Sequence, residues 1–294
     1  MKRFFIFASA AIVALASCAK MEVVRNDAPE EIAFKQITNV MTKTITDGLA
    51  AGNMSVFAYW DGAEYFGNSQ FVKDGSSTTY KGSPAKYWPV SGDVDFLLYA
   101  PYDNSVSRTD ANTLTGISKN TNDQTDLLYG HVTASKTNDA VDVTLYHALA
   151  KVLIQVSGTS SVSLLNVELM NTTQKATAVI NAVTPSVSWT ADLTAPKLTT
   201  VSLYSPSNPT IGDELSNTPK ECDPFLVVPL NANAASIKLT YKMGSSAAVS
   251  HVIQLSSAEW NAGKQYTYSI SITPVEIKFT PSAGEWGSGG SITL

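Results

Sequence analysis

The sequence predicts an all-β fold organised as two β-sandwiches in tandem, and three observations lead to this prediction. Apolar residues recur with a period of two, and those positions are rich in β-branched and aromatic side chains, as is typical of half-buried strands. No window of about 12 residues keeps the 3.6-residue period of an amphipathic helix. The chain has 294 residues, which is long for one sandwich, so two fit better.

Four runs show the alternation most clearly, and turn-forming residues separate them at 60–62, 74–76, 91–93, 206–209 and 244–246. The junction between the two sandwiches is expected near residue 145. In chain order, the apolar positions that share one side are Met54, Val56, Ala58 and Trp60; Val94, Phe96, Leu98 and Ala100; Tyr146, Ala148, Ala150, Val152, Ile154 and Val156; and Ile237, Leu239, Tyr241 and Met243.

The first 17 residues are predicted to be a signal peptide. Lys2 and Arg3 precede an apolar stretch over 4–16, which is too short to span a bilayer and has the length of a signal-peptide core. Residues 15–18 read Leu-Ala-Ser-Cys and resemble the bacterial lipobox, which would place cleavage before Cys18 and a lipid on its sulfur. The alternative is an ordinary signal peptide with an incidental cysteine. The first interpretation predicts a lipoprotein of the outer membrane, held there through its lipid.

The charge of the chain argues against nucleic-acid binding, and its cysteine content argues against an intramolecular disulfide. Asp and Glu number 25 against 20 Lys and Arg, and no basic cluster occurs that could neutralise phosphates, so nucleic acid is not an expected partner. If Cys18 carries lipid, only Cys222 remains, and no intramolecular disulfide can form. Core burial must then carry the stability of the fold, and Cys222 has no assigned role.

The sequence offers no set of residues for catalysis, and we predict neither an enzyme nor a bound metal or cofactor. The histidines His131, His147 and His251 are dispersed and have no cysteine pair to complete a zinc site. Asp93 and Asp95 point the same way on one strand, but they alternate with apolar neighbours and are expected to face solvent. Four aromatic residues could instead stack on sugars, and glycan binding is kept as an alternative: Trp60, Tyr65, Tyr87 and Trp88.

An ordered set of short segments resembles the fimbrillin-like family of Bacteroidales, the type V pilins. The segments are 32–34, 41–44, 56–60, 87–89, 96–101, 126–129 and 143–152, together with Trp260, Gly263, Tyr266 and Tyr268. The resemblance implies a pilus subunit made as a lipoprotein precursor, with two transthyretin-like β-sandwiches. It also implies export to the cell surface, cleavage by a trypsin-like protease, and polymerisation by strand exchange with copies of itself or related subunits.

The resemblance places the processing site at Lys43, after a removable first strand that contains Ile32 and Phe34. Family members typically have arginine at that position, where this chain has lysine. Arg25 is the alternative site; a cut there would release the lipid and leave the first strand in place. A sandwich without its first strand exposes unpaired backbone groups and an apolar groove, which a strand from another chain can fill.

The tail after residue 273 is the candidate donor strand, because Val275, Ile277 and Phe279 alternate with polar residues there. The alternative is that this segment is the last strand of the second sandwich. The expected organisation is therefore a signal peptide over 1–17, a lipidated segment with the removable strand over 18–43, sandwiches over 44–145 and 146–273, and a tail over 274–294.

Two other functions remain open at this stage. The chain could be a surface lipoprotein that binds glycans or a host protein and does not polymerise, or it could be the tip or anchor subunit of a pilus. An uncleaved first strand or an unused tail would mark a tip or anchor subunit.

Overall fold

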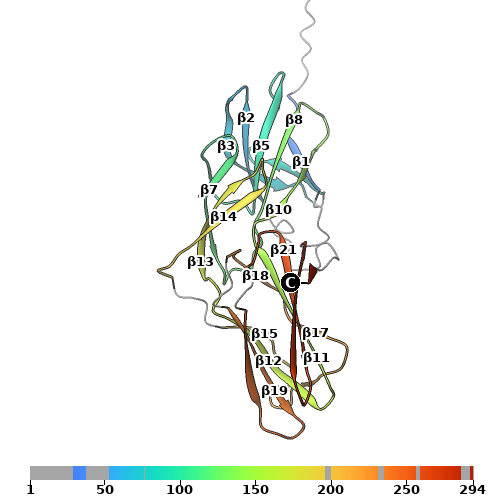
Figure 1. Ribbon diagram of the computed structural model, residues 1–294. Helices are drawn as coiled ribbons and strands as arrows, with labels where there is room; N and C mark the ends of the chain where they lie inside the picture. Colours follow the sequence, from blue (N-terminus) through green and yellow to red (C-terminus); the bar gives the residue numbers. More distant parts are fainter. Residues whose placement is uncertain are drawn as a thin grey trace, which may run out of the picture.

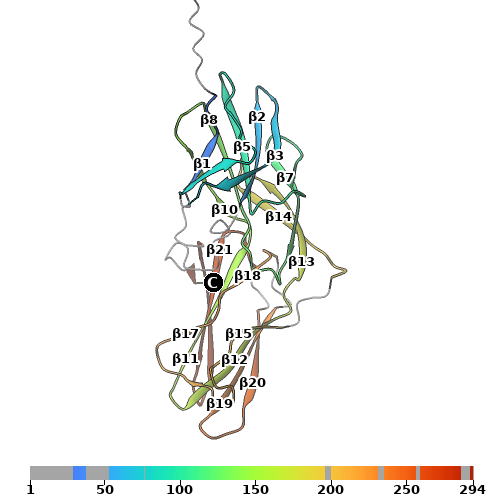
Figure 2. The same ribbon diagram turned by 180° about the vertical axis from the view of Figure 1, so that it is seen from behind.

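The computed structural model describes residues 29–37, 53–75, 77–195, 200–230, 235–255, 259–285 and 292–293. All secondary-structure elements in these residues are β-strands, so the all-β prediction is confirmed. The molecule is elongated, with the early strands at one end and the late strands at the other (Figure 1), as the reverse view also shows (Figure 2). The described part of the chain has no helix long and apolar enough to cross a membrane.

One eight-stranded sheet forms the end that contains the first strands. Its spatial order is β10 (Tyr146–His147), β8 (Leu128–Ser135), β5 (Asp93–Ala100), β2 (Met54–Trp60), β3 (Ala63–Lys73), β4 (Thr79–Gly82), β1 (Ala33–Ile37) and β9 (Val141–Thr144). Buried side chains from strands as distant in this order as β8 and β9 join one cluster, so the sheet curves around its own core. We call this cluster the N-terminal core; it includes Ile32, Phe34, Met54, Val56, Phe71, Tyr80, Trp88, Val94, Phe96, Leu98, Leu128, Val141 and Val143.

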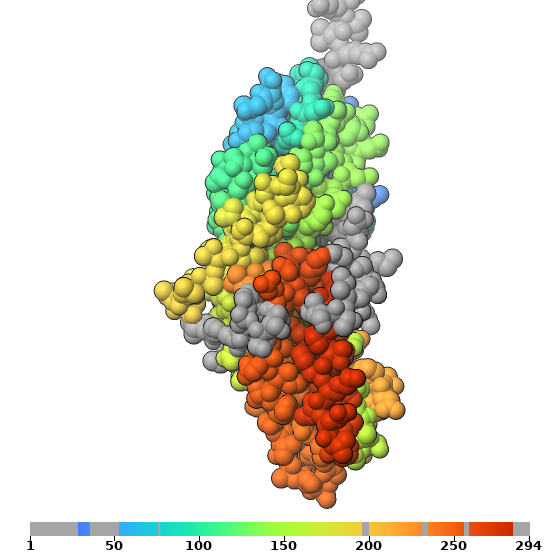
Figure 3. Space-filling model, viewed as in Figure 1, coloured from blue at the N-terminus to red at the C-terminus, as the bar shows by residue number. Residues whose placement is uncertain are grey.

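A four-stranded sheet covers the outer face of β2, β5 and β8. Its order is β14 (Ser186–Ala191), β13 (Lys175–Asn181), β7 (Thr113–Asn120) and β6 (Ser107–Arg108). The β13–β14 hairpin comes from the second half of the chain but pairs with β7 of the first half, and its yellow surface lies against the green part in Figure 3. Between the two sheets is the middle core, which includes Phe57, Leu97, Tyr99, Leu114, Ile117, Tyr129, Ala148, Leu149, Ala178, Ile180 and Leu226.

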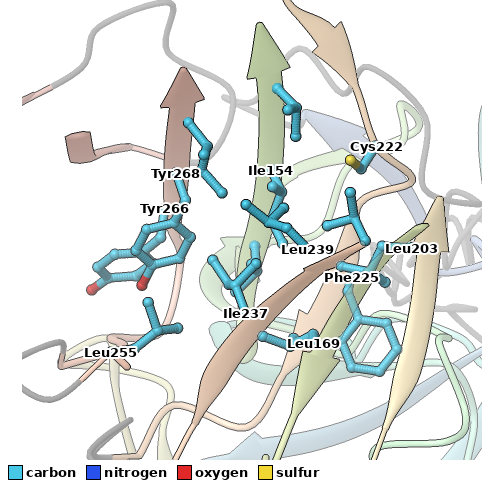
Figure 4. Packing of buried hydrophobic residues seen from close by; sticks show 14 of the residues in the cluster. Ile154, Leu169, Leu203, Cys222, Phe225, Ile237, Leu239, Leu255, Tyr266 and Tyr268 are labelled. Atoms are coloured by element: carbon cyan, nitrogen blue, oxygen red, sulfur yellow. The ribbon is translucent and has the colours of Figure 1, made fainter. Parts of the chain in front are cut away.

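Two further sheets face each other at the other end. The first contains β11 (Ala150–Gly158), β21 (Lys264–Ile272), β22 (Ile277–Glu285) and β23 (Ile292–Thr293), with β17 (Lys220–Glu221) and β18 (Phe225–Val227) beside β11. The second contains β15 (Val201–Tyr204), β12 (Val162–Met170), β19 (Ser236–Met243) and β20 (Val249–Gln254), with β16 (Asp213–Glu214) beside β12. The C-terminal core between them includes Ile154, Leu169, Ile237, Leu239, Phe225, Tyr266 and Tyr268 (Figure 4).

The single run expected over 144–156 is divided in the structure. Ala148 and Leu149 lie in the middle core, whereas Ala150 and Val152 lie in the C-terminal core. The backbone N–H of Ala148 donates to the carbonyl of Leu127 at 2.8 Å, which extends the pairing of β10 with β8, whereas Ala150 pairs with Val227 of β18. Apolar residues are frequent in this run because it passes from one core to another.

The side chain of Gln124, in the loop after β7, also forms hydrogen bonds with strand β18. The Gln124 amide donates to the carbonyl of Leu226 at 3.2 Å, and its Oε1 accepts the Leu226 backbone N–H at 2.7 Å. Leu226 itself belongs to the middle core, while its neighbours Phe225 and Val227 face the C-terminal core. Strand β18 therefore packs into both cores at once.

Candidate strand-exchange site

The first strand lies inside the eight-stranded sheet rather than at its edge. Strand β1 pairs antiparallel with β4 through Phe34 and Tyr80, and parallel with β9 from Phe34 opposite Val141 to Ile37 opposite Thr144. Just before β1, the N–H of Ile32 donates to the carbonyl of Lys86 at 2.7 Å. Strand β1 therefore uses the backbone groups of two neighbouring strands, which would otherwise both be sheet edges.

The two side chains expected in the removable strand are both fully buried. Ile32 and Phe34 have relative exposures of 0% and belong to the N-terminal core. The ring of Phe34 meets Phe96 edge-on at 5.0 Å between centroids, and Phe71 at 5.4 Å. Without β1, these two rings would line an apolar groove between β4 and β9.

Partly exposed ion pairs lie beside strand β1. Lys136 Nζ lies 3.7 Å from Glu30 Oε2, next to the start of the strand. Lys81, which pairs with Ala33 in the ladder, lies 3.0 Å from Asp74. A hydrogen bond with Asp74 and its negative charge raise the pKa of Lys81, so this lysine stays charged on the exposed side of β4.

The predicted modification sites lie outside the described residues. These are the lipidation site Cys18, the processing site Lys43 and the alternative site Arg25. Lys43 nevertheless falls between β1 and β2 in the sequence. A cut at Lys43 would therefore leave β1 attached to the rest of the molecule by non-covalent contacts alone.

The candidate donor residues are found in and beside the strand β22. Strand β22 pairs antiparallel with β21 along its length, from Ile277 opposite Ile272 to Glu285 opposite Lys264. Ile277 and Phe279 are half-buried against the C-terminal core, and Phe279 stacks on Tyr268 with 5.6 Å between centroids. In a single chain these residues thus belong to the last long strand of their own sheet, which is the alternative that the alternation left open.

Val275 behaves differently from the other two candidates. It precedes β22 and its side chain is 91% exposed. It lies in a turn closed by the N–H of Thr273, which donates to the carbonyl of Glu276 at 2.9 Å. Val275 is therefore accessible, but it is not part of the strand in this arrangement.

Strand β22 is only weakly held on its second side. Within the described residues its other neighbour is β23, which pairs only with Ser282 and Ala283. The first part of β22, including Ile277 and Phe279, thus has one backbone partner. Such an edge can pair with another chain.

The same short sequence pattern, Glu-Ile-x-Phe, occurs at the start of strands β1 and β22. Glu31-Ile32-Ala33-Phe34 precedes and enters β1, and Glu276-Ile277-Lys278-Phe279 precedes and enters β22. In both, isoleucine and phenylalanine are two residues apart and face the same side. A comparison of the sequence with itself would have found this match. The candidate donor residues thus resemble the residues of the removable strand.

The residues considered for catalysis take structural positions. Asp93 and Asp95 are exposed and accept hydrogen bonds from Ser135 and Thr133 across the sheet. His251 is exposed on β20. No group of three or more His, Cys, Asp or Glu residues that could hold a metal ion occurs among the described residues.

One of the four aromatic residues considered for glycan binding is buried. Trp88 is 7% exposed and meets Phe96 in the N-terminal core at 5.6 Å between centroids. Trp60 and Tyr65 lie together, 5.9 Å apart, and the hydroxyl of Tyr65 donates to the carbonyl of Tyr87 at 2.9 Å. Only three of the four residues thus remain partly accessible.

Cys222 is buried in the C-terminal core, 4% exposed (Figure 4). Burial, with the nearby charge of Asp223, raises the pKa of its thiol to about 12, so the reactive thiolate is scarce at pH 8. We expect iodoacetamide to leave Cys222 unmodified in the folded Cys18→Ser chain and to alkylate it in guanidinium chloride, where the pKa returns to about 8.5. Mass spectrometry reads the result, and equal labelling of folded and unfolded protein would contradict it.

Together these features define an all-β chain whose first strand completes a core and can be separated by one cut. The model of the fimbrillin-like family matches residues 35–286, so the chain belongs to this family. Fimbrillin-like proteins are a family of cell-surface proteins and not a class of enzymes. No curated protein matches the chain.

Solved structures show the same fold at low sequence identity. A candidate cell adhesion protein from Bacteroides uniformis is 17% identical, with a TM-score of 0.56 over 87% of this chain and 99% of its own. One from Bacteroides ovatus is 16% identical, with a TM-score of 0.57 over 88% and 98%. A fimbrial protein from Bacteroides vulgatus is 14% identical, with a TM-score of 0.52 over 86% and 99%. At these identities the likeness concerns the fold alone.

Proposed function

We propose that this protein is a structural subunit of a surface pilus that polymerises by strand exchange with copies of itself or related subunits. In this proposal it is exported as an outer-membrane lipoprotein whose lipid is attached to Cys18. It loses β1 after a trypsin-like protease cuts at Lys43. The observation that carries the proposal is the match between Glu31-Ile32-Ala33-Phe34 and Glu276-Ile277-Lys278-Phe279. The second segment has the side chains needed to replace the first.

Proteolysis acts as the switch because it changes the effective concentration of β1. While the chain is intact, β1 is tethered to its groove, and an effective concentration in the millimolar range or above disfavours any competing strand. After the cut, β1 can dissociate and is diluted. The groove is then left with the unpaired edges of β4 and β9 and an apolar floor.

The donor can fill this groove with similar contacts. Ile277 would replace Ile32 and Phe279 would replace Phe34, so the two apolar side chains that leave are replaced by two of the same kind. Each contributes about 1.5–3 kcal/mol of burial. The donor must first leave β21, which costs part of this gain, and the dilution of the dissociated β1 then favours the exchanged state.

The test is polymerisation of the purified Cys18→Ser chain after limited trypsin treatment. We expect chains with an N-terminus at Thr44 to give a ladder on mild electrophoresis and fibres in electron micrographs. Phe279→Asp should abolish both, because a carboxylate cannot be buried in the apolar groove without a large cost. Val275→Asp is the matched control, because Val275 is exposed and outside β22.

Two results would count against the proposal. One is a cleaved, folded chain that stays monomeric at high concentration, which would favour the non-polymerising surface lipoprotein. The other is equal polymerisation of Phe279→Asp and Val275→Asp. Lys43→Gln and Arg25→Gln distinguish the two cleavage sites, and only the first should prevent fibres.

A further inference from the structure

A small polar cavity lies beside the middle core, at the side of the eight-stranded sheet. Its volume is about 290 Å³, and it lies between the loop that follows β5 and the loop that follows β7. The buried residues Tyr99 and Lys119 line its inner part. The lining also includes Tyr102, Asp103, Asn104 and Asp123. The volume is near the lower end of the range for small-molecule sites, about 300–1,000 Å³.

The inner end of the cavity has a polar group without a partner. Tyr99 is only 2% exposed, and its ring packs in the middle core. Among the described residues none forms a hydrogen bond with its hydroxyl. Burial, and the charges of Asp103, Asp126 and Asp123, raise the pKa of Tyr99. The hydroxyl therefore keeps its proton and can donate a hydrogen bond to a ligand. Tyr99 lines the cavity and no described residue accepts a hydrogen bond from its hydroxyl, so the hydroxyl is free to bond a ligand there.

The acidic residues of the cavity are held in place by their own loops. Asp103 Oδ1 accepts hydrogen bonds from the N–H and the hydroxyl of Ser105, at 2.8 and 2.7 Å. Asp123 Oδ1 accepts the N–H of Thr125 at 2.9 Å. Each carboxylate has two oxygens and about four acceptor positions, so each can accept further hydrogen bonds without a change in its own position.

The charge of the cavity narrows the class of ligand. The two carboxylates disfavour an anion, as a phosphate or a carboxylate would be repelled. Lys119 is 3% exposed, donates to the carbonyl of Thr125 at 2.5 Å and lies 3.4 Å from Asp123, so its positive charge disfavours a metal ion. An apolar ligand would leave the Tyr99 hydroxyl unpaired, which is costly.

We propose that this cavity binds one neutral pyranose unit of a surface glycan. A sugar hydroxyl both donates and accepts, so it can donate to Asp103 or Asp123 and accept from Tyr99 at the same time. The Tyr102 ring offers an apolar surface for the C–H face of the sugar, and the Asn104 amide can bond a further hydroxyl. The cavity has space for a single ring, so the rest of a glycan would extend into solvent.

The test is saturation-transfer NMR of the purified protein with glucose, galactose, mannose and N-acetylglucosamine. Mannitol, which has hydroxyls but no ring, is the negative control, and ethylammonium represents a lysine side chain of a protein partner. We expect saturable binding of at least one pyranose in the millimolar range, as suits a few hydrogen bonds, and no binding of mannitol or ethylammonium. Binding of ethylammonium without any pyranose would overturn the proposal.

Two variants locate the binding in the cavity. Tyr99→Phe removes only the hydroxyl and should weaken binding by about fivefold or more, the effect of one hydrogen bond. Asn104→Ala, in an exposed loop, should also weaken binding without any effect on the fold. Tyr65→Phe, whose hydroxyl lies elsewhere, is the matched control. Binding that is equal in all three variants, or no binding by any pyranose, would overturn the proposal, and neither outcome depends on polymerisation.

Discussion

Replacement of Phe34 by alanine should reduce the free energy of unfolding of the end that contains the N-terminal core by about 3–5 kcal/mol. Phe34 is 0% exposed and meets two aromatic rings edge-on, so alanine removes both contacts and leaves a cavity between them. Since β1 is held from both sides, the backbone cannot easily move to fill that space. Urea unfolding followed by tryptophan fluorescence and circular dichroism measures the effect, with Trp88 beside Phe96 as a local reporter.

Lys35→Ala is the matched control for this change. Lys35 is the next residue of β1, pairs with Thr79, and has an exposed side chain. Its replacement should change the unfolding free energy by no more than about 0.5 kcal/mol. If Phe34→Ala is as mild as Lys35→Ala, β1 does not complete the N-terminal core, and its removal would not create a groove for a donor.

The strands were most predictable from the sequence where only one face is buried. Residues 237–243 alternate strictly, and in β19 Ile237, Leu239 and Tyr241 are buried. The polar residues that alternate with them are partly exposed: Lys238, Thr240 and Lys242. Strand β5 is harder to read because it lies between two cores. Phe96 and Leu98 face the N-terminal core, whereas Leu97 and Tyr99 face the middle core. Alternation alone showed the first set and did not show that the opposite face is also covered.

The donor segment shows a different limit of sequence analysis. Ile277 and Phe279 alternate with polar residues, and this pattern suits the edge of their own sheet and the groove of another chain equally well. The structure places both against the C-terminal core in the monomer, where Phe279 stacks on Tyr268. The shared Glu-Ile-x-Phe segment was present in the sequence, but its meaning depends on the finding that Ile32 and Phe34 are both fully buried.

The cavity beside Tyr99 could not be predicted from local patterns. Its lining comes from two loops and from two strands that belong to different sheets, and only the packing of those sheets brings Asp103 near Asp123. Composition and spacing describe neighbours along one element. They do not describe a hydroxyl that borders a cavity between two loops.

Replacement of Asp126 by alanine should have the second large effect, a loss of about 3 kcal/mol or more in unfolding free energy. The imidazole Nδ1–H of His147 donates to Asp126 Oδ2 at 2.5 Å, and Asp126 Oδ1 accepts the backbone N–H of Leu127 at 2.8 Å. The two side chains are only 5% and 6% exposed. Alanine would leave a buried ring nitrogen and a buried backbone N–H without this acceptor, next to the segment that joins the cores.

The pair at the surface of the same molecule provides the control. His131 Nε2 lies 3.5 Å from Asp95 Oδ1, and these side chains are 23% and 52% exposed. His131→Ala should therefore cost less than about 1 kcal/mol. A double-mutant cycle with Asp126→Ala and His147→Ala should give a coupling energy of at least about 1 kcal/mol, because each change alone removes the hydrogen bond between the two side chains. Additive single changes, or equal losses for Asp126→Ala and His131→Ala, would show that the buried pair does not stabilise the junction of the two ends.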